Sequence, residues 1–413
     1  MGDALIIDVC RTPRGIGRVG KGALASFHPQ HLAATVLRAV VERNDLRSED
    51  IDDVIWGVST QQGKQGRDLA RMAALFAGFD ERVSGVTLDR FCGSGITAVS
   101  FGAGQIMSGM EDLIVAGGTE MMSHVAELRA SDPSSGMLDA GNLALRRMRP
   151  QSNQGICADA IATLDGIPRE ALDDLAYQSQ QRAEVAIREG RFDRSLVPVL
   201  DEHGAIALDR EEYPRPQTTR EGLAALKPSF AELADLPIDA DGTTFGGMIR
   251  RAFPDLKFNH VHHAGNSSGV VDGAAAVLLA SPAYAARNGL KPRARIRAMA
   301  NVGADPTLML NGPGPAARKA LAKAGLTLDD IDLWEVNEAF AIVPEKFIRD
   351  LGVDREKVNV NGGAIALGHP IGCTGAILIG TILDELERRD LKRGLVTMCA
   401  AGGMAPAIVI ERV

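Results

Sequence analysis

Apolar residues in this chain occur either in short runs or at the spacing of a helix. Short apolar runs predict strands, and the helical spacing predicts helices that bury one face. In the N-terminal part, strands are predicted over 5–9, 53–58, 85–88 and 112–117, and helices over 29–44, 68–77 and 96–107. The strand over 85–88 is part β-branched and is predicted to be buried. Strands that alternate with helices indicate an α/β fold with a parallel sheet.

The middle of the chain, from about residue 121 to 258, has a different character. It is rich in proline, aspartate and arginine, and it holds one clear amphipathic helix over 169–189. Residues 259–280 then return to a composition rich in glycine, alanine and valine. We therefore predict a loop-rich insertion, or lid, over an α/β core.

Short matches between the two parts of the chain recur at a constant offset of 280 residues. Residues 50–52 read Asp-Ile-Asp, as do residues 330–332, while Leu46 matches Leu326 and Gly95 matches Gly375. A constant offset at separate places predicts two similar strand–helix halves with pseudo-twofold symmetry. We place the halves at 1–280, including the loop domain over about 121–258, and at 281–413. Equivalent helix starts would then face one shared cleft.

The composition is that of an ordinary globular protein and narrows the classes of function. Of the 413 residues, 45% are hydrophobic and 24% are charged, and the net charge of -8 gives no support for nucleic-acid binding. No apolar run reaches the length of a membrane span, and the N-terminus enters a predicted strand without a basic signal segment. The five cysteines are widely spaced, which argues against a disulfide framework and fits a reducing compartment. We expect a cytoplasmic location.

Two motifs suggest chemistry that their surroundings do not support. Residues 15–20 match the G-x-G-x-x-G pattern and most of a phosphate-binding loop, but Gly22 stands where such a loop has Ser or Thr, and no helix opens directly from the glycines. His260, His262 and His263 lie close together, without an acidic or thiol partner at metal-ligand spacing. We interpret the first motif as a surface loop and the second as surface or loop histidines, and we predict no metal site.

One cysteine, Cys92, lies between a predicted strand and a predicted helix in the run Phe91-Cys92-Gly93-Ser94-Gly95. A thiol at a helix N-terminus meets unpaired N–H groups and the positive end of the helix dipole, and both favour the thiolate. The glycines would let a substrate approach the backbone closely. The alternative is a buried, inert cysteine, since free cysteine is commonly buried.

The C-terminal half places further reactive side chains after its own strands. Asn337 follows a strand over 332–336, His369 stands among glycines before a helix start, and Cys399 follows the last predicted strand. Ligands bind at strand ends in α/β sheets, so these residues and Cys92 are predicted to share one cleft. A thiolate can accept an acyl group, an imidazole can take its proton, and amide N–H groups can stabilise oxyanions. With a second thiol to move a proton at a second carbon, the set suits carbon–carbon bond cleavage or formation between thioesters.

Together these motifs resemble the thiolase family over essentially the full chain. The resemblance rests on Cys92-Gly93-Ser94-Gly95, on Gly-Asn-Ser-Ser-Gly at 265–269 with Asp272-Gly273, on Asn337-Glu338-Ala339-Phe340, on Gly368-His369-Pro370, and on Cys399 with Gly402-Gly403. It implies the thiolase fold, with two fused βαβαβ-type halves in a layered α/β core and a loop domain inserted in the first. It also implies acyl transfer between acyl-CoA thioesters, with coenzyme A as a substrate and no cofactor.

The resemblance assigns roles to the matching positions. Cys92 would be the acylated nucleophile, His369 its base, and Cys399 the acid/base for the α-carbon proton of acetyl-CoA. Asn337 would hold a water that, with His369, stabilises the enolate oxygen. The N–H groups of Cys92 and Ala401 would form the other oxyanion hole, although the family usually has glycine where Ala401 stands. Contacts to coenzyme A and the acyl group would come from Arg215, Ser268, Met309, Ala339 and Phe340.

The implied reaction is thiolytic cleavage of a 3-oxoacyl-CoA to acetyl-CoA and a shortened acyl-CoA, as in fatty acid β-oxidation, or the reverse condensation. Two departures from the family pattern, Asn153-Gln154-Gly155 in place of the usual Met-Gly loop and a longer segment over 231–263, favour an unusual or bulkier acyl chain. The alternatives are a biosynthetic enzyme that forms acetoacetyl-CoA, a ketoacyl synthase with two histidines beside its cysteine, and a non-catalytic CoA- or lipid-binding protein. The family also implies a homodimer or homotetramer.

Overall fold

The computed structural model describes residues 2–132 and 137–413, and its core is one sheet of ten strands. The strands of the chain are β1 (Leu5–Arg11), β2 (Gly15–Ile16), β3 (Asp53–Gly57), β4 (Ser84–Leu88), β5 (Leu113–Met121), β6 (Val199–Leu200), β7 (Ile206–Leu208), β8 (Val271–Ala280), β9 (Ala294–Gly303), β10 (Leu333–Val336), β11 (Arg393–Thr397) and β12 (Met404–Arg412). The order in the large sheet is β10-β11-β12-β9-β1-β8-β5-β3-β4, with β2 paired to β8, while β6 and β7 form a separate pair.

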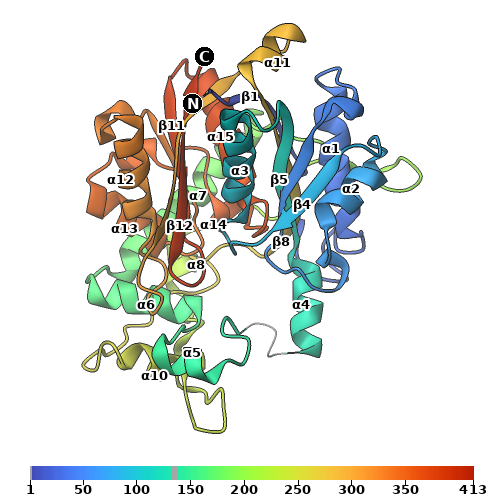
Figure 1. The fold of residues 1–413 in the computed structure, drawn as a ribbon. Helices are drawn as coiled ribbons and strands as arrows, with labels where there is room; N and C mark the ends of the chain where they lie inside the picture. The colour runs from blue at the N-terminus through green and yellow to red at the C-terminus, as the bar shows by residue number, and fades with distance from the viewer. Residues whose placement is uncertain (1, 133–136) are drawn as a thin grey trace.

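Helices cover the sheet in layers. They are α1 (Pro29–Glu42), α2 (Leu69–Ala77), α3 (Ser94–Ser108), α4 (Met122–Ser131), α5 (Leu143–Met148), α6 (Gln154–Leu164), α7 (Arg169–Arg188), α8 (Arg220–Ala224), α9 (Ala231–Asp235), α10 (Phe245–Arg250), α11 (Pro282–Arg287), α12 (Pro313–Ala324), α13 (Ile342–Leu351), α14 (Ala364–Leu367) and α15 (Thr374–Arg388). The pair α1 and α2 packs on one outer face and the pair α12 and α13 on the other (Figure 1). Helices α3 and α15 lie between the two ends of the sheet and share one apolar core with both.

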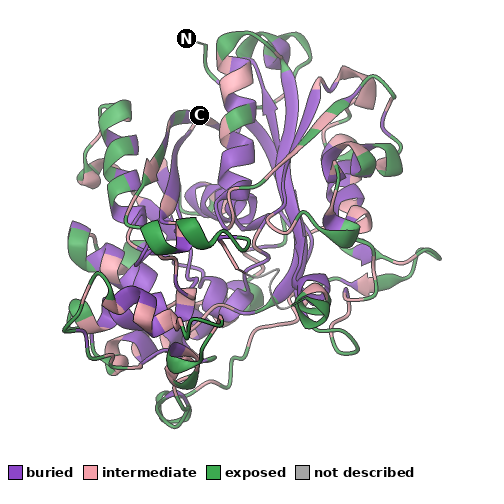
Figure 2. Cartoon of the chain, turned by 60° about the horizontal axis from the view of Figure 1, so that its bottom comes forward, coloured by how far each residue is buried: buried purple, intermediate pink, exposed green. Residues whose placement is uncertain are grey.

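The sequence contains clear start and stop signals for several of these helices. The Asp68 carboxylate caps α2 by accepting from the Arg71 N–H, and Gly78 ends the helix in the left-handed conformation, with φ of 85°. Gly109, with φ of 78°, ends α3 in the same way. Buried residues concentrate in the central helices and the strands, and exposed residues on the outer helices (Figure 2). The predicted layered α/β core is confirmed.

The repeat at an offset of 280 residues corresponds to equivalent contacts in the two halves. One Asp52 carboxylate oxygen accepts from the Asp112 and Leu113 N–H groups at the start of β5, at 2.9 and 2.8 Å. The Asp332 carboxylate accepts from the Lys392 and Arg393 N–H groups at the start of β11, at 2.9 and 2.8 Å. The repeated aspartates therefore fix the same strand start twice.

The matched glycines of the repeat meet each other where α3 and α15 cross. A Cβ on Gly95 would lie 3.0 Å from the Gly375 nitrogen, and a Cβ on Gly375 would lie 2.2 Å from the Ile96 nitrogen. Glycine is required here because the two helix backbones touch. The sheet runs across both halves, joined by β1 and β9, and the division after residue 280 stays a prediction.

Two sequence expectations about strands are wrong. The sheet is parallel only between β3, β4 and β5 and between β10 and β11, whereas its central pairs are antiparallel. Strand β4 is not buried: it is the edge of the sheet, and Val86 is 45% exposed. β-branched residues suit an edge as well as a centre, so residue type alone does not distinguish the two.

The middle of the chain is more helical than predicted, since α4 to α10 all lie within it. The glycine-rich motif near the N-terminus forms a turn held by Glu212, whose carboxylate accepts from the Ile16 N–H at 2.7 Å and the Ala23 N–H at 3.2 Å. The expected surface loop is therefore confirmed only from Arg18 onward, because Gly15 and Ile16 form strand β2 against β8. Within residues 2–132 and 137–413, none of the helices combines the length and apolar character needed to cross a membrane.

Candidate active site

Cys92 sits on a sharp turn between the edge strand β4 and helix α3. Phe91 adopts the left-handed conformation with φ of 49°, which is strained for a residue with a side chain. The strained turn is held by the Asp89 carboxylate, which accepts from the Phe91 N–H at 2.6 Å, and by Ser94 Oγ, which accepts from the Arg90 N–H at 2.9 Å and donates to the Phe91 carbonyl at 2.7 Å. The turn places Cys92 at the start of α3, with only 4% of its surface exposed.

The expected lowering of the Cys92 pKa is wrong for this structure. Burial raises the pKa of the thiol from 9.0 to about 12, and the nearby Glu120 carboxylate raises it further. A hydrogen bond with the Gln154 side chain acts in the opposite direction but is the smaller effect. Loss of hydration outweighs the helix N-terminus because the thiolate has almost no contact with water. The resting nucleophile is therefore a neutral thiol.

His369 is held as a neutral imidazole with a defined tautomer. Its Nδ1 lies 2.6 Å from Thr374 Oγ1, and because that hydroxyl donates to the Pro370 carbonyl at 3.0 Å, it accepts the proton on Nδ1. The Nε2 lone pair then faces the Asn337 Nδ2 group at 3.3 Å. Burial lowers the pKa of His369 from 6.5 to about 4, so Nε2 is an unprotonated base at neutral pH.

Asn337 is positioned for more than its bond to His369. Its backbone N–H donates to the Thr397 carbonyl at 3.1 Å, which fixes it beside the end of β11. Its Oδ1 atom is buried and has no hydrogen-bond partner among the described residues. A buried amide oxygen without a partner is costly, and a water molecule can satisfy it. This agrees with the predicted water-holding role.

Cys399 follows β11 directly and is fully buried. Burial raises the pKa of its thiol far above 9.0, and the nearby Cys92 adds to the increase. Beyond Cys399 the chain turns tightly, with the Ala400 N–H donating to the Met404 carbonyl at 2.7 Å and with Gly402 and Gly403 in the left-handed conformation. The two halves thus bring two protonated thiols together.

Predicted site residues line two cavities, one of about 260 Å³ and one of about 310 Å³. The larger, the Cys92 cavity, is lined by Ser59, Phe91, Cys92, Arg129, Met137, Leu138, Gln151, Ser152, Asn153, Gln154, Phe245, Ile371 and Ala401. Within the described chain, neither the Cys92 N–H nor the Ala401 N–H donates to a carbonyl or side-chain oxygen. Both N–H groups are thus available to an oxyanion in this cavity, as the predicted pairing requires.

The smaller, the Arg215 cavity, is lined by Gln180, Tyr213, Arg215, Gln217, Thr218, Thr219, Gly222, Leu223, Leu226, Ala264, Gly265 and Ile365. The Arg215 guanidinium stacks on the Tyr213 ring, 5.1 Å from its centroid. It is the only one of the predicted contact residues that lines this cavity.

The other predicted contact residues lie outside both cavities. The Ser268 N–H donates to the Ala339 carbonyl at 3.0 Å, so these two residues are neighbours. Phe340 packs edge-on against Phe230 at a centroid distance of 5.9 Å. Met309 lies fully buried in the core, and its contact with the acyl group stays a prediction.

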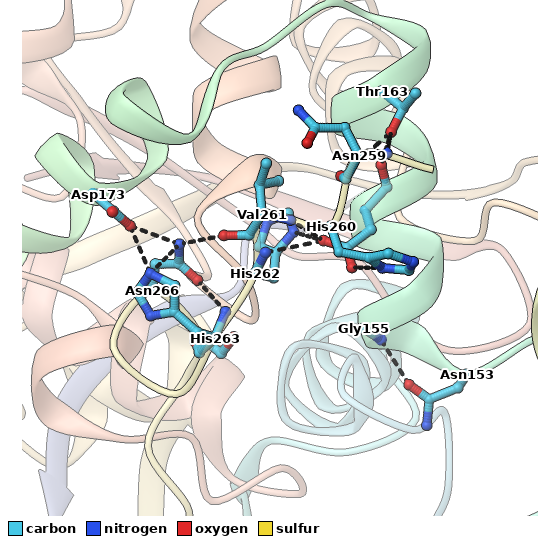
Figure 3. A network of polar contacts seen from close by, with 12 residues as sticks. Asn153, Gly155, Thr163, Asp173, Asn259, His260, Val261, His262, His263 and Asn266 are labelled. Carbon is cyan, nitrogen blue, oxygen red and sulfur yellow. Dashed lines mark hydrogen bonds and ion pairs between the residues drawn. The ribbon is translucent and has the colours of Figure 1, made fainter. Parts of the chain in front are cut away.

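The three histidines near residue 260 lie in a loop, as expected, but two of them are not on the surface. His262 and His263 are buried, and His260 is partly buried. Asp159 on α6 binds both His260 and His262 through their Nδ1 atoms, at 2.7 and 2.8 Å, while His263 pairs with Asp173 (Figure 3). Among the described residues, no group of three or more histidine, cysteine or acidic side chains is arranged to hold a metal ion. The histidines instead tie the end of the insertion to α6 and α7.

Sequence reasoning missed several residues that shape the site. Thr374 fixes the His369 tautomer, and Gln154, which the sequence marks only as a departure from the family pattern, bonds the nucleophile. Glu120 accepts from the Ser59 and Thr60 N–H groups, at 2.9 and 3.1 Å, and from the Gly372 N–H at 2.9 Å. This carboxylate joins the two halves beside the site. Its partners are too distant in sequence for any local pattern to reveal them.

The raised pKa of Cys92 makes a direct prediction for the free protein. Alkylation of Cys92 by iodoacetamide requires the thiolate, and the fraction of thiolate rises with pH up to the pKa. With that pKa near 12, the alkylation rate is expected to keep increasing through about pH 9, as followed by peptide mass spectrometry. A plateau near neutral pH would show a depressed pKa and contradict the structure.

Comparisons with known proteins agree with the geometry. The thiolase N-terminal domain model matches residues 4–235, and the thiolase C-terminal domain model matches residues 290–412. A 3-ketoacyl-CoA thiolase from Cronobacter sakazakii is 41% identical over 420 residues, which span 100% of both chains. An acetyl-CoA acetyltransferase from Syntrophomonas wolfei is 39% identical over 99% of both chains. The crystal structure of the Bacillus anthracis acetyl-CoA acetyltransferase superposes with a TM-score of 0.83 at 34% identity, and covers 100% of this chain and 99% of that one.

Proposed function

The chain belongs to the thiolase family, and from this premise we propose how its residues carry out acyl transfer. It is an acyl-CoA:acetyl-CoA C-acyltransferase, which cleaves a 3-oxoacyl-CoA with coenzyme A to acetyl-CoA and a shortened acyl-CoA, or runs the reverse condensation. We place Cys92 as the acylated nucleophile, His369 as its base and Cys399 as the second acid/base. The observation that supports this most strongly is the cavity that Cys92 and Ala401 line together, because Ala401 stands two residues after Cys399 in the chain.

In the first half-reaction, Cys92 Sγ attacks the 3-oxo carbon of the substrate and passes its proton to His369 Nε2. The neutral state of both groups means that the proton moves as the attack proceeds. The bond between C2 and C3 then breaks, and C2 takes the proton of Cys399 to give acetyl-CoA. The acyl group remains on Cys92 as a thioester.

In the second half-reaction, the thiol of coenzyme A attacks the acyl-Cys92 carbonyl and gives its proton to the Cys399 thiolate. Cys92 leaves and recovers its proton from His369, so the protein returns to its starting state. The N–H groups of Cys92 and Ala401 stabilise the oxyanion at the 3-oxo carbon, and Asn337 with its water and His369 stabilise the enolate of acetyl-CoA.

We propose that the coenzyme A arm binds at the Arg215 cavity. Arg215 lines this cavity and offers a cation to the phosphates of the coenzyme. Ser268 follows directly on the loop whose Gly265 lines the same cavity, and we place it beside the pantetheine part of the arm.

The experiment that tests this assignment traps the acyl intermediate. The protein is incubated with acetoacetyl-CoA without free coenzyme A, quenched in acid and digested, and the acetylated peptide is identified by mass spectrometry. The acetyl group is expected on Cys92, and subsequent addition of coenzyme A should remove it. An acyl group on any other cysteine would overturn this assignment of roles.

The alternative functions make different demands on the same residues. A non-catalytic CoA- or lipid-binding protein would not need to keep two thiols and an imidazole, all of them buried, at the motif positions of this family. A ketoacyl synthase would place a second histidine where this chain has Asn337 or Cys399. The biosynthetic formation of acetoacetyl-CoA uses the same groups in reverse, and the relatives include proteins with either name. We propose the degradative direction, as in cytoplasmic β-oxidation, because the Cys92 cavity of about 310 Å³ has room for more than an acetyl group.

We further propose that the protein is a homodimer that pairs through β4, alone or within a tetramer. The edge strand β4 leaves Val86 exposed, next to the exposed Met72 and Phe76 of α2. An unprotected apolar edge strand is a site for pairing with another strand.

Replacing Val86 with lysine is therefore expected to shift the mass measured by light scattering toward that of the monomer. The variant Val19→Lys, in an equally exposed loop position, is the matched control. A Val86→Lys protein that keeps the wild-type mass would rule out this interface.

A further inference from the structure

The Cys92 cavity carries more polar side chains than a hydrocarbon acyl chain requires. Its lining includes the polar residues Ser59, Arg129, Gln151, Ser152, Asn153 and Gln154. Apolar side chains are also present, among them Leu138 and Phe245, but they do not enclose the cavity alone. The cavity therefore presents a mixed surface to whatever acyl group is attached to Cys92.

Some of these polar side chains already form hydrogen bonds within the protein. Ser152 Oγ donates to the Phe245 carbonyl at 2.9 Å, and Asn153 Oδ1 accepts from the Gly155 N–H at 2.9 Å, where it caps α6 (Figure 3). Gln154 bonds the Cys92 thiol. These three residues shape the cavity wall, and the first two have only part of their hydrogen-bonding capacity left for a ligand.

Two lining side chains have no such internal role. In the part of the chain that the structure describes, neither Arg129 nor Gln151 makes a side-chain hydrogen bond, and Arg129 makes no ion pair. Arg129 lies near the end of α4 and is the one cationic residue in the described lining. Arg129 is exposed to solvent, so among the described residues the cavity of the reactive thiol has an arginine on its solvent side that is available to pair with an anion.

We propose that the preferred substrate is a 3-oxoacyl-CoA whose acyl chain ends in a carboxylate, which pairs with Arg129 and the Gln151 amide. This inference rests on the proposed acylation of Cys92. Arginine binds carboxylates with two parallel hydrogen bonds, and an amide donates to the same group. Leu138 and Phe245 contact the methylene groups between the two ends. A chain that ends in a methyl group leaves these polar groups without partners, and sites built for a polar group discriminate strongly against its absence.

Arg129 is not needed for the phosphates of coenzyme A. The Arg215 cavity, which we assign to the coenzyme A arm, shares no described lining residue with the Cys92 cavity. We therefore assign the coenzyme to the Arg215 cavity and the acyl group to the Cys92 cavity. Cleavage of 3-oxoadipyl-CoA would break its C2–C3 bond and yield acetyl-CoA and succinyl-CoA, with no co-reactant other than coenzyme A.

The test compares substrates that differ only in the terminal group. Thiolysis of 3-oxoadipyl-CoA and 3-oxopimelyl-CoA is measured beside that of 3-oxohexanoyl-CoA and 3-oxoheptanoyl-CoA, with acetoacetyl-CoA as the reference. For the wild-type protein, kcat/KM is expected to be roughly 10- to 100-fold higher for the carboxylate-ended member of at least one pair. Arg129→Gln should reduce this ratio to near one. Arg147→Gln, which makes the same change in charge at an exposed position of α5 outside the cavity, should keep it.

A wild-type protein that cleaves the methyl-ended substrates as well as their partners would overturn the proposal, and so would a preference that Arg129→Gln leaves intact. Binding provides a second readout that does not depend on turnover. With Cys92→Ala protein, succinyl-CoA should bind more tightly than butyryl-CoA by calorimetry, and the added Arg129→Gln change should remove the difference. Equal binding would contradict the proposal. Failure of the proposed function is distinguished from these outcomes because it would abolish acetoacetyl-CoA thiolysis and acylation of Cys92.

Discussion

Alanine at position 92 is expected to reduce thiolysis of acetoacetyl-CoA by roughly 10⁴-fold or more, the scale seen when an enzyme loses its nucleophile. The change removes the sulfur that we propose forms the acyl bond, and we do not expect Cys399 to replace it, because we assign that thiol to proton transfer. The loss of enolate absorbance measures the rate. The same variant should show no acetyl group on any cysteine after incubation with acetoacetyl-CoA.

The matched control for this substitution is Cys10→Ala. Cys10 is also buried, and its Sγ donates to the Val36 carbonyl at 3.3 Å, far along the chain from the site residues. It should lower the stability slightly, through a lost contact and a small cavity, and keep the rate of thiolysis. A Cys92→Ala protein that retains full thiolysis would refute the proposed mechanism.

Alanine at position 375 is expected to destabilise the protein by about 3 kcal/mol or more, at the upper end of the range for overpacked cores. Its Cβ would lie 2.2 Å from the Ile96 nitrogen, so α3 and α15 would have to move apart. Because α3 begins directly after Cys92 and Gly93, and α15 begins with Thr374, the hydrogen-bond partner of His369, the shift would separate the catalytic groups. A displacement of about 1 Å is enough to slow an enzyme by roughly 10²-fold. Thermal unfolding and acetoacetyl-CoA thiolysis measure the two effects.

Gly104→Ala is the control for this prediction. Gly104 lies within α3, and a Cβ there would meet no atom within 4 Å. Alanine is the better helix former, so this variant should have an unfolding temperature equal to or slightly above that of the wild type. If Gly375→Ala behaves like Gly104→Ala, the two helices do not depend on their backbone contact.

The α/β class, the family and the acyl-transfer function were all accessible from sequence, and the comparisons and the fold confirm them. Helices such as α2 could be predicted because their signals are local: Asp68 before the first turn, apolar residues at helical spacing, and Gly78 after the last. The repeat could be recognised because both halves use the same interaction at the start of a strand. Asp52 and Asp332 supply this interaction, and they stand at equivalent positions of the two halves.

Other features could not be predicted from the sequence, because they depend on contacts between residues that are distant in the chain. The thiol of Cys92 was expected to ionise easily because its neighbours in sequence form a helix start, but its neighbours in space exclude water and raise its pKa. The burial of β4 was predicted wrongly, because strand order in a sheet is set by long-range pairing and not by composition. His262 and His263 do lie in a loop, but their burial was not predicted, because their partners Asp159 and Asp173 come from helices distant in the sequence.

The residues proposed to carry the chemistry were therefore recognisable one by one, while their relation to one another was not. Cys92, His369 and Cys399 could be named from motifs, because each motif is a short stretch with its own turn. The hydrogen bond from His369 to Thr374, the proximity of Cys399 to Cys92, and the cavity that Arg129 and Cys92 both line arise from packing. Burial and distance set pKa values and hydrogen-bond partners, and both are properties of the folded chain.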